Sequence, residues 1–227
     1  MNLTLDIGNT AVKWATFEGR KLKDYGYGMP EELITKADHV LASASGDIST
    51  LNFKFPTLNS SKPLPIKLDY KTPKTLGADR VSDACGAVSL HPGVPCLVID
   101  AGTCITIDFV DAKGVYHGGA IMPGLKMNLQ ALHTFTAKLP LIDIEGVEKA
   151  PVLGRSTEES ILAGTLGATL LSLAGFVTLY KEKAPNLHVL LTGGDAERLM
   201  ASGAKGWEHV AHLTLIGLNE ILIYNEN

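Results

Sequence analysis

One pattern occurs twice in this chain: a short apolar strand ends in an aspartate and turns back through glycine and threonine. The first copy reads LTLDIGNTAVKWATF at residues 3–17, and the second reads CLVIDAGTCITIDFV at residues 96–110. The aspartates that end the two strands are Asp6 and Asp100. Because the copies lie roughly half a chain apart, the repeat predicts two duplicated α/β lobes rather than a solenoid of short units.

The residues of the repeated turn suit a phosphate-binding hairpin. Gly8 and Gly102 allow close approach of the backbone to a ligand, and successive turn amides can form a concave anion site. Asp6 could hold hydrated Mg²⁺ over the same phosphates. A single copy would be more typical of a plain strand that ends in an Asx-type turn. Two facing copies predict a cleft that binds a polyphosphate from both sides, a layout similar to that of the actin-like, sugar-kinase-like ATPase superfamily.

Composition indicates a globular protein and gives no sign of a nucleic-acid partner. Hydrophobic residues make up 45% and charged residues 19% of the 227 positions, and the net charge is −4. No basic run occurs. The cysteines are three in number and lack metal-ligand spacing, as do the seven histidines. Without a signal peptide at its N-terminus, the sequence is expected to be that of a cytoplasmic protein.

Residues 161–180 carry no charge and approach the length of a membrane span. The preceding Ser156-Thr-Glu-Glu sequence matches a helix capping box. A helix that is apolar on all sides either spans a membrane or is buried between protein layers. A span in the middle of a two-lobed enzyme would split the fold, so we expect a buried helix at a subunit interface and no membrane partner.

Further elements are expected around the two hairpins. A helix is predicted over residues 75–90, where Asp79 and Asp83 share one face; its acidic first turn could be purely structural, with Arg80 solvated. A second helix is predicted over residues 125–138. Residues 187–191 predict a strand that runs into a Thr-Gly-Gly turn and a helix, and residues 213–224 predict a short strand and a terminal helix. The expected lobes are residues 1–95 and 96–214, with a helix at about 215–227 that can pack back on the first lobe.

Five motifs follow one another in a specific order along the chain. They are DIGNTAVK at residues 6–13, GADR at 77–80, DAGTCITID at 100–108, GGAIMPG at 118–124 and TGG at 192–194. With this ordered set the chain resembles the type III pantothenate kinases over nearly its whole length. The resemblance implies two duplicated actin-like (ribonuclease H-like) lobes, each a mixed sheet flanked by helices, with a cleft between them. It also implies ATP-dependent phosphorylation of the primary hydroxyl of pantothenate, the first step of coenzyme A biosynthesis.

The resemblance implies a role for each matching residue. Asp79 would be the catalytic base, and Asp100 would bind a monovalent cation, K⁺ or NH₄⁺. Asp6 would also lie near Mg²⁺, with water between them. Arg80 would suit the pantothenate carboxylate, and Thr157 would reach pantothenate across the interface of a homodimer. The pantothenate contacts would be Tyr70, Gly77, Ala78, Asp79, Arg80 and Thr157. The ATP contacts would be Asp6, Ile7, Gly8, Asn9, Thr10, Ala11, Val12, Lys13 and Thr103.

Two other classes of function are compatible with the same motifs. One is a different small-molecule kinase of the superfamily, acting on a sugar or an acyl group. The other is a nucleotide-binding regulatory or accessory protein that keeps the fold without the activity. The acidic residues Asp6, Asp79 and Asp100 are all present, which favours an active kinase.

Overall fold

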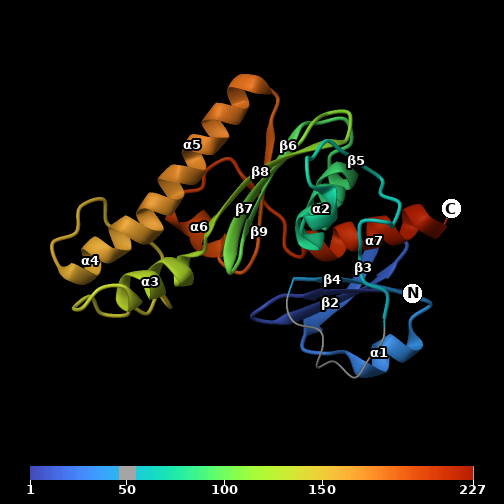
Figure 1. The fold of residues 1–227 in the computed structure, drawn as a ribbon, viewed down its shortest axis with the longest axis horizontal. Coiled ribbons are helices and arrows are strands. Elements are labelled where there is room, and N and C mark those ends of the chain that lie inside the picture. The colour runs from blue at the N-terminus through green and yellow to red at the C-terminus, as the bar shows by residue number, and fades with distance from the viewer. Residues whose placement is uncertain (46–54, 227) are drawn as a thin grey trace. The chain divides into compact units, whose positions relative to one another are not determined.

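The computed structural model describes residues 1–45 and 55–226, which form an α/β fold with two mixed sheets flanked by helices (Figure 1). The chain divides into two compact units. Unit 1 comprises Met1–Cys96, Asp108–Gly118 and His212–Asn227, and unit 2 comprises Leu97–Ile107 and Gly119–Ala211. Asn227, the last residue of the predicted terminal helix, lies outside the described residues.

The first sheet contains four strands in the order β3-β2-β1-β4. Strand β1 pairs antiparallel with β2 and parallel with β4, and β2 pairs antiparallel with β3. Side chains from the sheet, including Leu3, Leu5 and Phe17, are fully buried. The elements of this part of the chain are β1 (Asn2–Ile7), β2 (Val12–Glu18), β3 (Lys21–Tyr27), α1 (Glu31–Lys36) and β4 (His39–Ala44).

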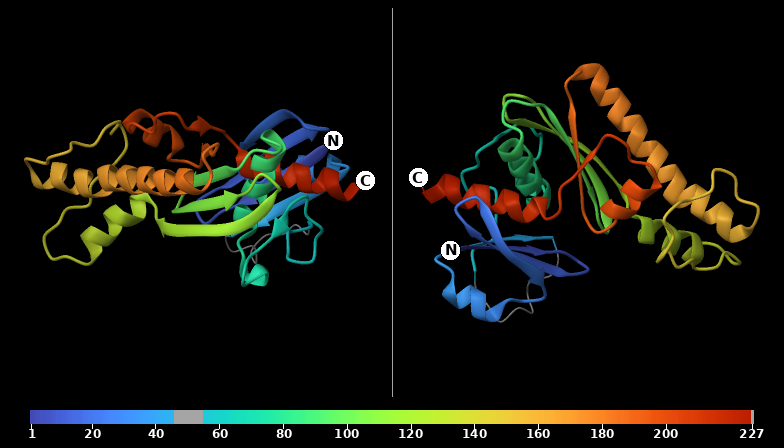
Figure 2. Two further views of the ribbon diagram at one scale, coloured as in Figure 1. Left: turned by 90° about the horizontal axis from the view of Figure 1, so that it is seen from above. Right: turned by 180° about the vertical axis from the view of Figure 1, so that it is seen from behind.

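Two helices, α2 (Ala78–Leu90) and α7 (Leu213–Glu226), also belong to unit 1. Figure 2 shows α7, drawn in red, beside α2 and the strands of the first sheet. A Cβ atom at Gly217 would overlap the carbonyl oxygen of Ser82, so glycine permits the close crossing of the two helices. Asn219 joins α7 to the sheet by hydrogen bonds to the Asn2 side chain (3.1 Å) and the Gly19 carbonyl (2.9 Å).

The prediction of a short strand near residue 213 is wrong, because α7 is helical from Leu213 onward. The first ten residues of this helix are buried on nearly every side, and the buried set includes polar Asn219 and Glu220. A helix that is buried all round has no polar stripe, and a short apolar run then fits a strand as well as a helix.

The second sheet has the order β10-β9-β6-β7-β8-β5. Its inner strands repeat the order of the first sheet, with β9, β6, β7 and β8 in the places of β4, β1, β2 and β3. This correspondence confirms the predicted duplication of the fold. The strands are β5 (Lys67–Leu68), β6 (Cys96–Ala101), β7 (Cys104–Val110), β8 (Val115–Pro123), β9 (His188–Thr192) and β10 (Glu208–His209).

Unit 2 contains a long helical stretch from Thr157 to Lys183 with one π-helical turn at Ala163–Gly167. Ser156 caps it as predicted: its hydroxyl accepts a hydrogen bond from the Glu159 amide at 3.1 Å. The helices of this unit are α3 (Leu125–Thr134), which ends four residues earlier than predicted, α4 (Thr157–Leu162), α5 (Ala168–Lys183) and α6 (Ala196–Ser202).

Within this chain the long helix is not buried on all sides. Thr169, Leu173 and Val177 form a buried stripe, whereas Leu171 is 75% and Leu179 56% exposed. By length and apolar composition alone, the stretch meets the requirements of a membrane span, which is weak evidence for one. Its burial at a subunit interface therefore stays a prediction.

Candidate active site

The first hairpin turn joins β1 to β2 in unit 1 and carries the predicted ATP contacts from Asp6 to Lys13. The Gly8 amide donates a hydrogen bond to the Ala11 carbonyl at 3.1 Å, which closes the turn. Residues 9–11 are exposed, whereas the Asp6 side chain next to them is largely buried. The turn therefore presents backbone to a ligand directly beside a carboxylate.

Asp6 is in an environment that disfavours a bare negative charge. Burial raises its pKa from 3.8 to about 6; Lys13, its partner in the β1–β2 ladder, opposes the rise, and the negative charge of Asp79 adds to it. A buried carboxylate with a second negative charge near it is an electrostatic setting that a divalent cation relieves. The residues present thus fit the Mg²⁺ position expected from the sequence.

Asp79 lies at the N-terminal end of α2, one residue after its start at Ala78. Its carboxylate accepts a hydrogen bond from the Arg80 amide at 2.8 Å and remains partly exposed. A Cβ atom at Gly77, the residue before the helix, would overlap the Asp79 carboxylate. Glycine at position 77 therefore leaves the space in which this carboxylate sits, beside the positive end of the helix dipole.

Arg80 is buried, with 6% of its surface exposed, and pairs with a carboxylate of the protein. Its Nε and Nη2 atoms donate to the Asp108 carboxylate of β7 at 2.6 to 3.1 Å. The interpretation of Arg80 as a solvated residue is therefore wrong. Its predicted role toward the pantothenate carboxylate is restricted, because two of its donor atoms are already bound by Asp108.

Tyr70 follows β5 and belongs to the same group of side chains. The Arg80 guanidinium carbon lies 6.0 Å from the Tyr70 ring centroid, and the Tyr70 ring meets that of Tyr116 edge-on, with centroids 5.8 Å apart. Gly118, at φ +86°, lies so close to Tyr70 that a Cβ atom there would be 2.9 Å from the ring. Unit 1 thus brings together two predicted pantothenate contacts, Tyr70 and Arg80.

The second hairpin turn joins β6 to β7 in unit 2 and is closed like the first, by a 3.0 Å hydrogen bond from the Gly102 amide to the Cys104 carbonyl. Two other glycine motifs meet this turn. The Gly124 amide donates to the Thr103 carbonyl at 3.1 Å, and a Cβ atom at Gly193 would overlap Asp100. The structure therefore collects the DAGT, PG and TGG motifs in one place in unit 2.

Thr157, the last of the predicted pantothenate contacts, begins α4. It lines an open groove of about 770 Å³ in unit 2. The other lining residues are Leu132, Leu139, Gly154, Arg155, Ser156, Ser160, Ile161 and Gly164. Neither Asp100 nor Thr103 lines this groove, so within unit 2 Thr157 belongs to a separate surface.

Sequence comparison decides the family of this chain. A family model described as type III pantothenate kinase matches residues 47–178. A type III pantothenate kinase of Cytophaga hutchinsonii is 39% identical over 236 residues, which cover 99% of this chain and 100% of the relative. This chain is a member of the type III pantothenate kinase family. A second relative, the type III pantothenate kinase of Bacteroides fragilis, is also 39% identical and is covered to 98% of its length.

Two solved structures share the fold of this chain over nearly its whole length. A putative Baf family transcriptional activator from Campylobacter jejuni aligns with a TM-score of 0.66 at 21% identity and covers 99% of both chains. The activator of 2-hydroxyisocaproyl-CoA dehydratase from Clostridium difficile, solved with ADPNP bound, aligns with a TM-score of 0.54 at 14% identity over 98% of this chain and 93% of that one. These likenesses support the predicted fold class.

Asp108 and Tyr116 contact Arg80 and Tyr70, yet sequence reasoning assigned neither of them a role. Asp108 ends the DAGTCITID motif, and its position in the middle of an apolar strand was the available signal. A charged residue is almost never fully buried unless it is paired, so a strand interior with one charge predicts a partner. Spacing along the chain could not identify Arg80 as that partner, because Arg80 lies 28 residues from Asp108.

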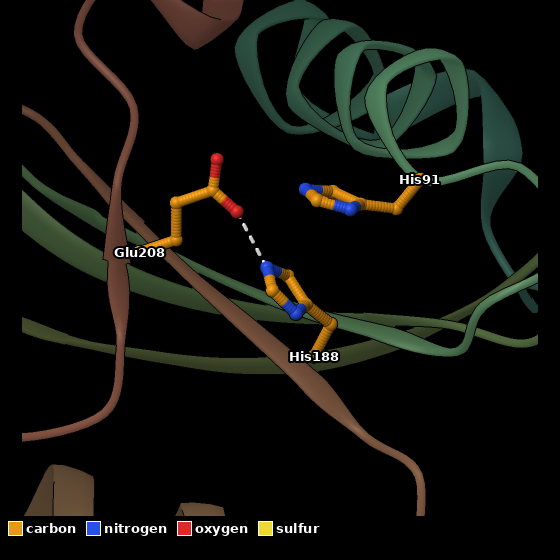
Figure 3. Close-up of side chains that lie close together, drawn as sticks. All are labelled: His91, His188 and Glu208. Atoms are coloured by element: carbon orange, nitrogen blue, oxygen red, sulfur yellow. Dashed lines mark hydrogen bonds and ion pairs between the residues drawn. The ribbon is translucent and has the colours of Figure 1, made fainter.

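Three histidines have carboxylate partners within their own unit. In unit 2, His188 Nε2 of β9 lies 2.5 Å from a carboxylate oxygen of Glu208 on the neighbouring β10 (Figure 3). In unit 1, His117 lies between Asp69 and Asp111, at 3.2 and 3.0 Å, and His39 lies 3.6 Å from Glu226. These pairs join neighbouring segments of each unit.

Proposed function

We propose that this protein transfers the γ-phosphoryl group of ATP to the primary hydroxyl of pantothenate, the first step of coenzyme A biosynthesis. Membership of the type III pantothenate kinase family supports the overall reaction. The structural observation that carries the proposal is the Asp79 carboxylate at the start of α2, held by the Arg80 amide at 2.8 Å and near enough to Asp6 for its charge to contribute to the raised pKa of Asp6. Phosphoryl transfer depends mainly on positioning and on neutralising spread negative charge, and this pair offers both a cation ligand and a base.

In the proposed reaction Asp79 is the general base. The hydroxyl oxygen of pantothenate forms a bond to the γ-phosphorus as the bond from that phosphorus to the β–γ bridging oxygen breaks, and ADP leaves. The hydroxyl proton passes to the Asp79 carboxylate. This carboxylate is fixed by the Arg80 amide and is partly exposed, so it is both oriented and accessible to a substrate.

The first turn and Asp6 would bind the phosphates together with Mg²⁺. When bound, Mg²⁺ would neutralise charge on the triphosphate. Asp6 would hold it through water, and the amides of the exposed residues 9–11 would donate hydrogen bonds to phosphate oxygens. The remaining predicted ATP contacts of unit 1, Ile7, Val12 and Lys13, would form the base of this turn. Thr103, on the second hairpin in unit 2, stays a predicted ATP contact.

Asp100 would bind a monovalent cation, K⁺ or NH₄⁺, in unit 2. The proximity of the Gly193 backbone, which would exclude any side chain at that position, supports this role. Carbonyl and carboxylate oxygens are suitable ligands for such a hard cation. The Thr-Gly-Gly turn at Thr192–Gly194 would then lie flat against the nucleotide.

A homodimer would complete the pantothenate site. The exposed apolar side chains of α5, including Leu171 and Leu179, support a subunit interface on the same helical stretch that begins with Thr157. Thr157 would reach the pantothenate of the partner subunit. A homodimer that acts on water-soluble substrates in the cytoplasm, without a membrane or nucleic-acid partner, is consistent with these features.

A coupled kinase assay tests the proposal. ADP release is measured with pantothenate, hexoses or acetate as acceptor, with Mg²⁺, and with and without K⁺. Turnover of pantothenate that depends on K⁺ is expected, and Asp79→Asn should lower kcat by at least about 100-fold with ATP binding retained. Glu31→Gln, which removes an exposed acid from the first turn of α1, serves as the matched control.

Each other outcome identifies a different function. Turnover of a hexose or acetate instead of pantothenate would indicate another small-molecule kinase. ATP binding without turnover of any acceptor, even with Mg²⁺ and K⁺, would indicate a regulatory protein. Wild-type turnover by Asp79→Asn would refute the assignment of the base.

A further inference from the structure

A fully buried polar network lies behind the proposed pantothenate contacts of unit 1. Its centre is Asp108, whose carboxylate is 1% exposed and accepts hydrogen bonds from Arg80 and from the Tyr116 hydroxyl at 2.7 Å. Tyr116 is 0% exposed. These three residues come from β7, α2 and β8, so the network joins three elements of the unit at one carboxylate.

Both oxygens of the buried Asp108 carboxylate accept hydrogen bonds, as a buried charge requires. Asp108 is approached by Nε and Nη2 of Arg80 and by one hydroxyl, so both of its oxygens have partners. Burial, and then the adjacent Asp108 carboxylate, raise the pKa of Tyr116, so that its hydroxyl keeps its proton and remains a donor. A buried ion pair contributes little net stability compared with apolar residues of the same size. Orientation of Arg80 is therefore a better explanation of the network than stability.

The network ends at Arg80 and Tyr70, the two side chains that are proposed to contact pantothenate in this part of unit 1. Arg80 directly follows Asp79 in the first turn of α2. The Arg80 guanidinium lies over the Tyr70 ring. Tyr70 in turn rests edge-on against Tyr116. Asp108 and Tyr116 thus fix Arg80 by hydrogen bonds and Tyr70 by ring packing.

We propose that Asp108 and Tyr116 are positioning residues for pantothenate: they hold the Arg80 guanidinium and the Tyr70 ring in the orientation that binds the acceptor substrate. This inference rests on the proposed function. Neither residue touches pantothenate, because neither has exposed surface with which to do so. Their effect passes through Arg80 and Tyr70, so it concerns the acceptor and leaves ATP binding unaffected.

Tyr116→Phe is the most informative variant because it removes only the hydroxyl and keeps the buried ring. Steady-state kinetics are measured with pantothenate and ATP varied in turn. We expect the KM for pantothenate to rise about tenfold, since small misplacements of a binding group have effects of this order or larger. The KM for ATP should stay within about twofold of the wild-type value, as should both constants in the control Tyr27→Phe, which alters a tyrosine that is 70% exposed.

A double-mutant cycle separates positioning from a general structural effect. In an Arg80→Gln background the hydroxyl of Tyr116 has no guanidinium left to orient, so Tyr116→Phe should cause no further rise in the KM for pantothenate. Thermal unfolding without substrate establishes that each variant is folded. If Tyr116→Phe does not fold, Asp108→Glu, which keeps the charge but displaces it, is measured by the same criterion.

Three results would overturn the inference: an unchanged KM for pantothenate in Tyr116→Phe, an equal rise in both KM values, or full additivity in the cycle. Failure of the wild-type protein to phosphorylate pantothenate is a different result. It would refute the proposed function itself, and the wild-type measurement that accompanies every variant distinguishes the two.

Discussion

Replacing Asp6 by asparagine should make the metal-free protein more stable at neutral pH while it impairs catalysis. The carboxylate is largely buried, and burial raises its pKa from 3.8 to about 6 against the opposing effect of Lys13. Asparagine has nearly the same shape and no charge. The variant therefore removes a charge that the folded protein accommodates poorly without a cation.

The sign and size of the effect follow from linkage between protonation and folding. An acid whose pKa is higher in the folded state binds its proton more tightly there, so stability falls as pH rises from 3.8 through about 6. At pH 8 the loss is complete and amounts to about 3 kcal/mol at most. Partial solvent screening reduces it to about 2 kcal/mol. Asp6→Asn should recover this amount at pH 8 and nothing at pH 3, where the acid is protonated in both states.

Urea unfolding between pH 3 and pH 8, in buffer with a chelator, measures this difference. Asp24→Asn, which replaces an exposed acid on β3 of the same sheet, is the matched control. Added Mg²⁺ should stabilise the wild-type protein and leave Asp6→Asn unchanged. A stability difference between Asp6→Asn and wild type that does not vary with pH would refute the reasoning.

Three further predictions concern glycines and a helix cap. Gly217→Ala should lower the free energy of unfolding by at least about 2 kcal/mol in urea, because its methyl group overlaps the Ser82 carbonyl; Gly175→Ala, in open space on α5, should be neutral or raise it by up to about 1 kcal/mol. Gly193→Ala, at φ +95°, should destabilise by about 1–3 kcal/mol and raise the KM for ATP more than that for pantothenate. Ser156→Ala should lower the free energy of unfolding by about 1 kcal/mol, measured by thermal melting, through loss of the cap.

The duplicated hairpins could be predicted from sequence because local rules specify them. An apolar strand, an aspartate and a glycine turn specify β1 and β6 within a few residues, and the observed β1 and β2 occupy the expected positions. The helix that carries Asp79 was also foreseen, since its acidic first turn and apolar stripe lie close together in the chain. These elements depend on neighbours in sequence.

Features that depend on distant residues were the ones that sequence reasoning missed. The environment of Arg80 is decided by Asp108, which reaches it only when β7 lies beside α2. The burial of α5 was predicted from composition alone. Composition does not reveal which sides of a helix pack against other elements, and the structure leaves one face of α5 exposed. The helical start of α7 was hidden because burial on all sides removes the periodicity that separates helix from strand.

The position of α7 has a consequence for how this protein is made. Because α7 contributes Leu218 and Ile221 to the core of unit 1 and binds Asn2 through Asn219, the first sheet lacks part of its covering until the ribosome has translated all of unit 2. The nascent strands would spend that interval with apolar surface uncovered, at risk of aggregation. A stalled or prematurely terminated message would therefore yield a product whose earliest segment, although synthesised in full, has no mature fold.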